Sequence, residues 1–231
     1  MSAVPGLCVI PARGGSKRIE KKNVRLFLGR PIISYSIQAA LASGCFQEIM
    51  VSTDDPEIAQ LALSLGAEVP FLRSAQTSGD TAGLAEVLLE VLSQYAQAGR
   101  RFEIAACVLA TAPLLAAADL QEAMSKLGSS RCDGILGVCR YSYPIQRSLV
   151  ERGGRLRMRW PWHYKSRSQD LKPCYHDAGQ FYIVRTGAFR LQRRLFLRQM
   201  LKYELPQTRV QDIDTEEDWR MAEHKYRLLH G

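Results

Sequence analysis

The chain has 231 residues, of which 46% are hydrophobic and 23% are charged, and its formal net charge is +8. This is the balance of an ordinary globular protein, and the length suits a single α/β domain with a small insertion. No apolar run approaches the ~20 residues that span a bilayer. The positive charge suits nucleic acid, a membrane surface or a small anionic substrate. Without a helix-turn-helix or RNA-binding signature, we favour the small anion and expect neither nucleic acid nor membrane as a partner.

The N-terminus and the cysteines bear on the cellular compartment of the protein. No positive region precedes the first apolar stretch, so we interpret that stretch as a strand and not as a secretory signal. Six cysteines are scattered along the chain without C-x-x-C pairs or metal-ligand spacing. We therefore expect reduced thiols and a cytoplasmic protein.

Apolar and amphipathic segments alternate through the first 140 residues. Pro31 and the pair Asp55-Pro56 suit helix starts, while Gly44 and Gly66 suit helix ends. The predicted strands are 7–12, 48–52, 104–109 and 133–138, with a short extended piece at 67–72, and the predicted helices are 31–43, 56–65, 81–99 and 116–127. Uniformly apolar strands that alternate with helices indicate an α/β fold with a mostly parallel sheet, covered on both faces.

The pattern changes after residue 140. Residues 140–175 are rich in Arg, Tyr, Trp and Pro, and Gly153-Gly154 predicts a hairpin turn, so we interpret this segment as an insertion of strands and loops. Strand pattern returns at 177–185, and the chain closes with a predicted strand, 208–214, and a helix. Between them, basic residues near helical spacing are most simply a solvated helix face: Arg190, Arg193, Arg194, Arg198 and Lys202. The whole chain, 1–231, is expected to be a single domain.

The loop after the first strand carries the strongest chemical signal. Residues 10–23, IPARGGSKRIEKKN, place two glycines, a guanidinium and several ammonium groups at the carboxyl end of a strand, where open α/β sheets bind ligands. Glycines let backbone N–H groups approach a phosphate, and Arg offers it a bidentate fork. The loop is neither a Walker P-loop nor a G-x-G-x-x-G loop. Composition alone leaves phosphate binding and a flexible basic loop as even alternatives.

Two carboxylates near the C-terminus form the second signal. Asp212 and Asp214 alternate on the predicted strand, so both are expected on one face. A carboxylate pair beside a phosphate loop suits Mg²⁺, which prefers oxygen ligands. The alternative is capping of the last helix, which Thr215 already provides. We interpret Asp55 as a helix cap and leave both Asp54 and Asp55 out of the site.

These motifs resemble the acylneuraminate cytidylyltransferases, the CMP-sialic acid synthetases. The family's CTP-binding signature corresponds to Arg13, Ser16, Lys17, Lys22 and Asn23, and the resemblance continues through 51–55, 69–73, 78–83, 110–113 and 211–219. It implies a Rossmann-like nucleotidyltransferase, CTP as substrate, a homodimer through the 140–175 insertion and Mg²⁺ as cofactor. Family positions near the nucleotide are matched by Arg73, Ser78, Thr81 and Thr111. In the implied reaction Arg13 and Lys17 neutralise the triphosphate, while Asp214 and Asp212 hold the metal.

The resemblance has one departure and one refinement. Many members have Gln-Pro where this chain has Leu109 and Ala110, so backbone groups around Thr111 are expected to recognise the base. The segments 143–149, 163–171 and 175–182 resemble the pseudaminic acid branch. They make Arg167, Gln169, Asp177 and Gln180 the expected contacts to the sugar or across a dimer. The alternatives are an enzyme for N-acetylneuraminic or legionaminic acid, or a nucleotide-binding regulatory protein without catalysis.

Overall fold

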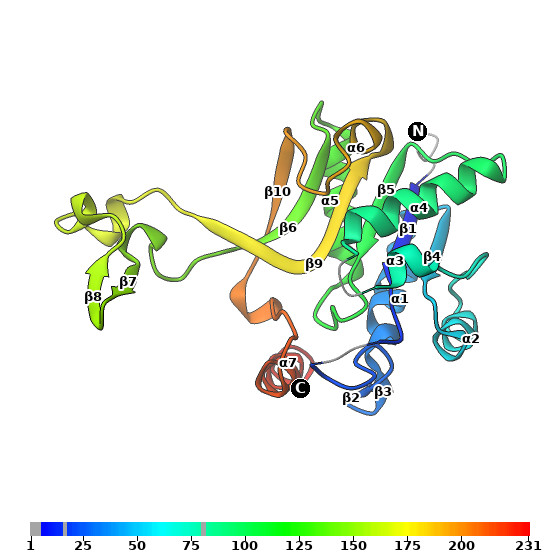
Figure 1. Ribbon diagram of the computed structural model, residues 1–231, viewed down its shortest axis with the longest axis horizontal. Helices are drawn as coiled ribbons and strands as arrows, with labels where there is room; N and C mark the ends of the chain where they lie inside the picture. Colours follow the sequence, from blue (N-terminus) through cyan, green and yellow to red (C-terminus); the bar gives the residue numbers. More distant parts are fainter. Residues whose placement is uncertain (1–5, 16–17, 80–81) are drawn as a thin grey trace.

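The computed structural model describes residues 6–15, 18–79 and 82–231 and arranges them around a six-stranded sheet (Figure 1). The strand order is β10-β6-β9-β5-β1-β4, and every neighbouring pair is parallel except those that involve β9. The strands are β1 (Gly6–Pro11), β4 (Glu48–Ser52), β5 (Ile104–Val108), β6 (Gly134–Arg140), β9 (Tyr175–Arg185) and β10 (Met200–Leu205). The predicted mostly parallel sheet is confirmed, and its core strands are uniformly buried because helices cover both faces.

The helices form two layers. On one face, α1 (Ile32–Ser43), α2 (Pro56–Ser64) and α5 (Ala117–Gly128) pack against the sheet. On the other lie α4 (Leu84–Gln97) and α6 (Thr186–Gln192). As predicted, the Asp55 carboxylate caps α2 by accepting from Glu57 N at 2.8 Å, and α1 ends at Gly44. In the described ranges, no helix is both long and apolar enough to cross a membrane.

The last helix, α7 (Glu216–His230), lies at the carboxyl edge of the sheet, beside the small hairpin of β2 (Leu26–Phe27) and β3 (Arg30–Pro31) (Figure 1). A separate apolar cluster joins them. Phe27 is fully buried and its ring meets Tyr35, Trp219 and Tyr226 edge-on at centroid distances of 5.4, 5.7 and 5.7 Å. This cluster fixes α7, and therefore the acidic residues just before it, against the start of α1.

Residues 141–174 form an arm that extends away from the sheet, while β6 and β9 lead into and out of it (Figure 1). The arm carries the hairpin of β7 (Leu149–Arg152) and β8 (Arg155–Met158) and the short 3₁₀ turns 145–147, 161–163 and 168–170. Gly153 and Gly154 have φ of +59° and +70°, which is the backbone of a type I′ turn. The predicted hairpin turn at Gly153-Gly154 is confirmed.

Two predictions about the elements are wrong. Residues 208–214 are not a strand: a 3₁₀ turn, Gln207–Arg209, leads into irregular chain. The basic residues 190–202 are not one helix face, because α6 ends at Gln192 and Lys202 lies in β10, where the burial of Tyr203 and Leu205 alternates with exposed neighbours. The short extended piece predicted at 67–72 pairs with β4 through a parallel bridge between Glu68 and Met50. A short helix, α3 (Ala75–Ser78), was not predicted.

Truncation of the central ring of the α7 cluster should destabilise the fold. We expect Phe27→Ala to lower the free energy of unfolding by about 3–5 kcal/mol, since a buried ring leaves a cavity. Leu26→Ala is the matched control in the same strand: this side chain is 62% exposed, so the loss should stay within about 0.5 kcal/mol. Chemical denaturation of both variants measures the difference, and equal losses would contradict the described packing.

Candidate active site

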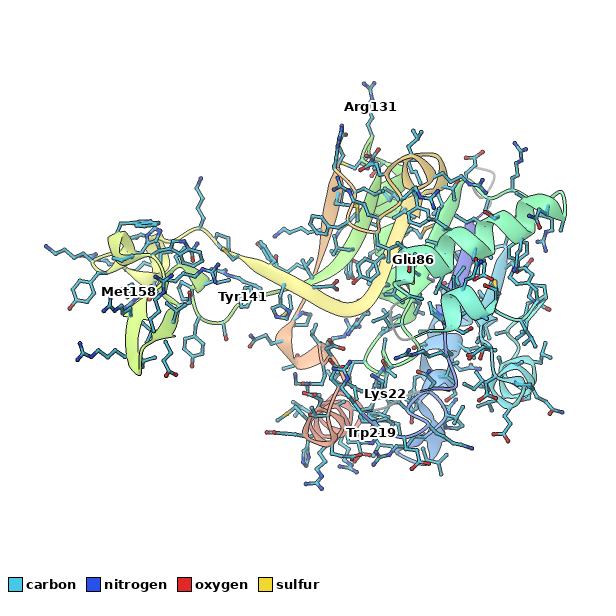
Figure 2. The ribbon with its side chains drawn as sticks, viewed as in Figure 1. Lys22, Glu86, Arg131, Tyr141, Met158 and Trp219 are labelled. Atoms are coloured by element: carbon cyan, nitrogen blue, oxygen red, sulfur yellow. The ribbon has the colours of Figure 1, made fainter. Side chains whose placement is uncertain are left out.

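A cavity of about 270 Å³ opens at the carboxyl ends of β1 and β5. This is the edge at which open α/β sheets bind ligands. Four cationic side chains line it together with a polar amide and apolar groups; the lining residues are Pro11, Arg13, Arg18, Lys22, Asn23, Arg73, Ala82, Leu84, Val87, Leu109, Ala110 and Thr111. Figure 2 shows Lys22 at this edge, on the same side as Trp219 of α7. A cation-rich cavity of this kind suits a phosphate-bearing ligand.

Contacts from several elements hold the loop after β1. The Asn23 amide donates to the carbonyl of Arg13 at 2.9 Å, and the backbone N–H of Gly14 donates to the Asp54 carboxylate at 3.1 Å. The sequence analysis left Asp54 out of the site, although its place directly after β4 puts it at the same sheet edge. Ser16 and Lys17, two of the predicted nucleotide contacts, lie outside the described residues.

Arg73 enters the cavity from the segment after β4. Its Nε donates to the Ser52 hydroxyl at 3.1 Å, and its guanidinium also bonds the Ser52 carbonyl. Burial lowers the pKa of Arg73, but a guanidinium remains charged at neutral pH. Ser78 lies in α3, where its hydroxyl bonds the Ser74 carbonyl, and it does not line the cavity. Thr81 is outside the described residues.

The segment at residues 109–111 forms the apolar end of the cavity. Thr111 is 9% exposed and lies in the lining, as do Leu109 and Ala110. The Leu109 N–H donates to the carbonyl of Gln180 at 2.9 Å, and the Leu109 carbonyl accepts from Ser36 at 2.7 Å. Because these contacts fix the backbone on either side of Leu109, they position the Ala110–Thr111 groups that are expected to recognise the base.

The predicted carboxylates face this cationic loop from what we call the acidic segment, residues 209–214. Asp214 lies 2.8 Å from Arg18 and 3.6 Å from Lys22, and the ammonium of Lys22 also donates to the carbonyl of Ile213 at 2.6 Å. Burial, followed by the neighbouring Asp214 carboxylate, raises the pKa of Asp212. The prediction that both residues share one face of a strand is wrong, because the segment is irregular. Arg18, which the sequence analysis did not select, belongs to the site.

The cap of α7 does not use the carboxylates of this pair; only the backbone N–H of Asp214 bonds the Asp218 carboxylate, at 3.1 Å. The Thr215 hydroxyl accepts from Asp218 N at 3.2 Å, and the Asp218 carboxylate accepts from Thr215 N at 2.8 Å. These two residues form the complete capping box. Asp212 and Asp214 are therefore available for another role.

The donor set of the pair fits Mg²⁺. The ion prefers carboxylate oxygens, usually takes one or two from the protein, and uses water and substrate phosphates for the rest. Asp212 beside Asp214 concentrates negative charge that a divalent cation would neutralise. Among residues 6–15, 18–79 and 82–231, no larger group of His, Cys, Asp and Glu is arranged for a metal.

The antiparallel strand β9 brings further polar groups to this edge, since its beginning lies beside the carboxyl ends of β5 and β6. The Asp177 carboxylate accepts from Gly179 N at 2.8 Å and from the Tyr182 hydroxyl. Burial, together with this bond, raises the pKa of Tyr182. Gly179 has φ of +63°, and a side chain added there would start 3.4 Å from the Asp212 carboxyl carbon. Asp177 and Asp212 thus lie next to each other.

The other predicted sugar contacts are placed differently. Gln180 is only 2% exposed and its amide donates to the carbonyl of Arg209 at 2.5 Å, so its prediction as a direct substrate contact is not supported. Arg167 and Gln169 are on the arm, and neither lines the cation-rich cavity. Of the predicted contacts, Asp177 is the one that lies beside Asp212, whereas Gln180 is buried against the carbonyl of Arg209.

Comparison with known proteins defines the class. Residues 7–151 match the family model named Cytidylyltransferase, and the chain belongs to this family. It is 40% identical over 225 residues to the pseudaminic acid cytidylyltransferase of Campylobacter jejuni, with 97% of each chain covered. It is 31% identical to the CMP-N,N′-diacetyllegionaminic acid synthase of Legionella pneumophila, with 94% of each covered. A solved CMP:2-keto-3-deoxy-manno-octonic acid synthetase with CTP has the same fold (TM-score 0.70, 17% identity, 97% and 99% of the chains covered).

A side chain at Gly179 should lower the activity of the site in addition to straining the backbone. We expect both Gly179→Ala and Gly153→Ala to lose roughly 1–2 kcal/mol of stability, because both glycines have left-handed φ. Only Gly179 faces Asp212; nothing lies within 4 Å of a Cβ at Gly153. Steady-state assays should therefore show a lower kcat for Gly179→Ala alone. An equal effect of the two variants on kcat would show that the Gly179–Asp212 approach is irrelevant.

Proposed function

We propose that the chain transfers CMP from CTP to a nonulosonic acid, with pseudaminic acid as the sugar, and releases pyrophosphate. The observation that carries this proposal is the cation-lined cavity whose Arg18 and Lys22 pair with Asp214, in a chain 40% identical to a pseudaminic acid cytidylyltransferase over 97% of its length. Transfer of this type depends mainly on positioning and on neutralising phosphate charge.

The roles of the chain's own residues follow from their placement. Arg13, Lys22 and Arg73 line the cavity, and with Lys17 from the same loop they would bind and neutralise the triphosphate of CTP. The oxygen of the anomeric hydroxyl bonds to the α-phosphorus and its proton passes to solvent. The bond from the α-phosphorus to the oxygen that bridges to the β-phosphate breaks, and pyrophosphate leaves with that oxygen. Asp212 and Asp214 would hold Mg²⁺, which, when bound, supplies charge neutralisation of the phosphate oxygens.

The sugar would bind beside Asp177. This carboxylate is fixed by Gly179 and Tyr182, so it presents acceptor oxygens in a defined direction. Pseudaminic and sialic acids differ in amide groups and stereochemistry, and a fixed set of hydrogen-bonding groups discriminates strongly between such substrates. The legionaminic acid relative, at 31% identity, makes that sugar the second candidate.

A pyrophosphate-release assay with CTP and a panel of sugars tests the proposal. We expect the highest kcat/KM with pseudaminic acid and lower values with legionaminic and N-acetylneuraminic acids. A higher kcat/KM with another of these sugars would make that sugar the substrate. Absence of release with all three, while CTP still binds, would favour a regulatory nucleotide-binding protein.

Replacement of Asp214 tests the proposed metal site. Asp214→Asn keeps the shape but removes one negative charge, so we expect kcat to fall on the order of a hundredfold, roughly 3 kcal/mol. The concentration of Mg²⁺ at half-maximal rate should rise. CTP affinity should change much less, because the cations of the loop remain. Asp212→Asn should have a similar effect on the rate.

A capping variant is the matched control for this experiment. Thr215→Ala removes the side-chain cap of α7 and should lower stability by about 1 kcal/mol, with a kcat near that of the wild type. Melting temperature and kcat are measured for both variants across a Mg²⁺ titration. Normal turnover of Asp214→Asn at low Mg²⁺ would refute the metal role.

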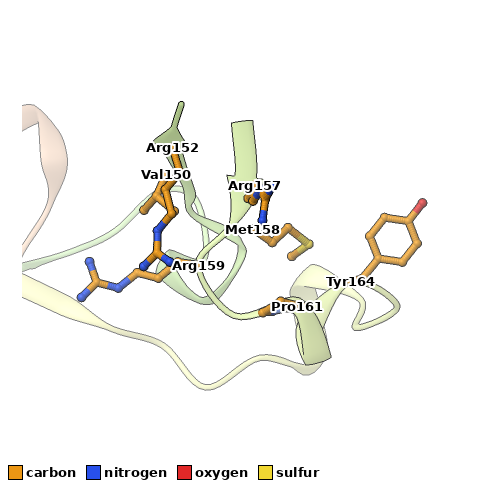
Figure 3. Close-up of a pocket in the computed structure, with 7 residues that line it drawn as sticks. All are labelled: Val150, Arg152, Arg157, Met158, Arg159, Pro161 and Tyr164. Atoms are coloured by element: carbon orange, nitrogen blue, oxygen red, sulfur yellow. The ribbon is translucent and has the colours of Figure 1, made fainter. Parts of the chain in front are cut away.

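We further propose that the protein forms a homodimer through the arm. Large apolar side chains there are exposed: Tyr143 (83%), Leu149 (57%), Leu156 (69%), Trp162 (72%) and Tyr164 (74%). A groove of about 1030 Å³ runs between the hairpin and the turn that follows it, lined by Val150, Arg152, Arg157, Met158, Arg159, Pro161 and Tyr164 (Figure 3). Aromatic and Arg side chains are enriched at interfaces. Arg167 and Gln169 are also on the arm. In such a dimer they would contact the sugar that is bound in the active site of the partner protomer.

Sedimentation and subunit mixing test this arrangement. We expect a dimer at micromolar concentration; a monomer would contradict the proposal. If the arm serves the partner's site, Asp214→Asn and Arg167→Ala are each impaired, but mixing them rebuilds one complete site in each mixed dimer. Two-fold symmetry then predicts recovery of about a quarter of wild-type activity. No recovery in proven mixed dimers would mean that Arg167 acts only within its own chain.

A further inference from the structure

The acidic segment, residues 209–214, is held in an unusual way. It belongs to none of the strands, so no sheet ladder bonds its carbonyl groups. Three side chains from outside the segment donate to them instead: Gln180 to the carbonyl of Arg209 at 2.5 Å, Lys225 to that of Val210 at 2.6 Å, and Lys22 to that of Ile213 at 2.6 Å. The position of Asp212 and Asp214 therefore depends on side-chain donors and not on strand pairing.

Gln180 is the neutral and most deeply buried of these donors. It is 2% exposed, and its amide oxygen has no hydrogen-bond partner among the described residues. A buried amide is normally bonded at both ends, and a hydrocarbon side chain of similar length would fill the same space without this cost. Packing alone therefore does not explain an amide here, whereas its bond to Arg209 does.

The carbonyl that Gln180 binds belongs to a residue that is itself fixed. The Arg209 guanidinium pairs with Asp119, which is 1% exposed. Asp119 in turn caps α5 by accepting from Ala116 N at 2.9 Å, and it accepts from the Tyr203 hydroxyl at 3.1 Å. With its side chain anchored to α5 and its carbonyl anchored to β9, Arg209 gives the acidic segment a defined starting point.

A bulge in β9 sets the direction of the Gln180 side chain. Tyr182 pairs with Leu136 and Asp177 pairs with Val138; between these pairs β6 has one residue and β9 has four. The extra residues turn Gly179 toward Asp212 and Gln180 into the interior. The carbonyl of Gln180 also accepts from Leu109 N at 2.9 Å. One residue thus connects the apolar end of the cavity with the acidic segment.

We propose that Gln180 is a positioning residue that holds Asp212 and Asp214 in place through the carbonyl of Arg209. It does not touch CTP, the sugar or the metal; it orders the chain that carries the two carboxylates. The proposal rests on the metal role of these carboxylates in the proposed function.

The test compares Gln180→Met with Gln121→Met. Methionine has nearly the length of glutamine but cannot donate, so each variant loses one bond from an amide to a backbone carbonyl; Gln121 donates to Ser43 at 3.0 Å, between α5 and α1. Hydrogen–deuterium exchange of the protein without ligands should be faster in residues 209–214 of Gln180→Met only. The Mg²⁺ concentration at half-maximal rate should rise on the order of tenfold in that variant, as is typical when support of a metal ligand is lost. CTP binding in EDTA should not change.

Each contrary outcome has a definite meaning. The proposal would be overturned if Gln180→Met kept the wild-type rate of hydrogen–deuterium exchange in residues 209–214 and an unshifted Mg²⁺ dependence. Faster exchange throughout the protein, together with a lower melting temperature, would also overturn it. If Gln180→Met does not fold, Gln180→Leu removes the same donor. An unshifted curve in Asp214→Asn would refute the metal site itself. A shift in Asp214→Asn without one in Gln180→Met would overturn the role of Gln180 alone.

Discussion

The ammonium group of Lys22 joins the two halves of the site. It donates to the carbonyl of Ile213 at 2.6 Å and lies 3.6 Å from the Asp214 carboxylate, 192 residues further along the chain. Its side chain is only 19% exposed, so solvent screens these contacts less than it would at the surface. The cationic loop after β1 and the acidic segment before α7 would each be self-repelling alone. Placed face to face, they neutralise each other, and Arg18 and Lys22 of the loop also line the cavity at the sheet edge.

The sheet topology brings these halves together. The loop after β1 and the chain after β10 both leave carboxyl ends of parallel strands, and the reversed strand β9 begins at the same edge. The cluster around Phe27 then packs α7 against the start of α1, which prevents the acidic segment from moving away. In the proposed function, phosphate would replace the carboxylate partners of the cations, and Mg²⁺ would replace the cationic partners of Asp214.

Much of this arrangement was predictable from the sequence. Apolar runs and Pro, Gly and Asp signals gave the parallel strands and the main helices, because burial on both faces leaves an unmistakable pattern. Strand β10 was missed, because its exposed Lys202 continued a run of basic residues at helical spacing. The acidic segment was predicted as a strand since its residues alternate, but side-chain donors replace the ladder. The inward direction of Gln180 follows from a bulge that local pattern does not encode.

The central claim is that Asp212 and Asp214, held opposite the cationic loop, bind the metal of a metal–CTP complex. A crystal structure with CTP and Mn²⁺ in place of Mg²⁺ tests it directly, since the anomalous signal locates the metal. The account predicts a peak held by the carboxylates of Asp212 and Asp214, with Lys22 at the triphosphate. A peak bound by phosphates alone, with Asp214 still paired to Arg18, would contradict it.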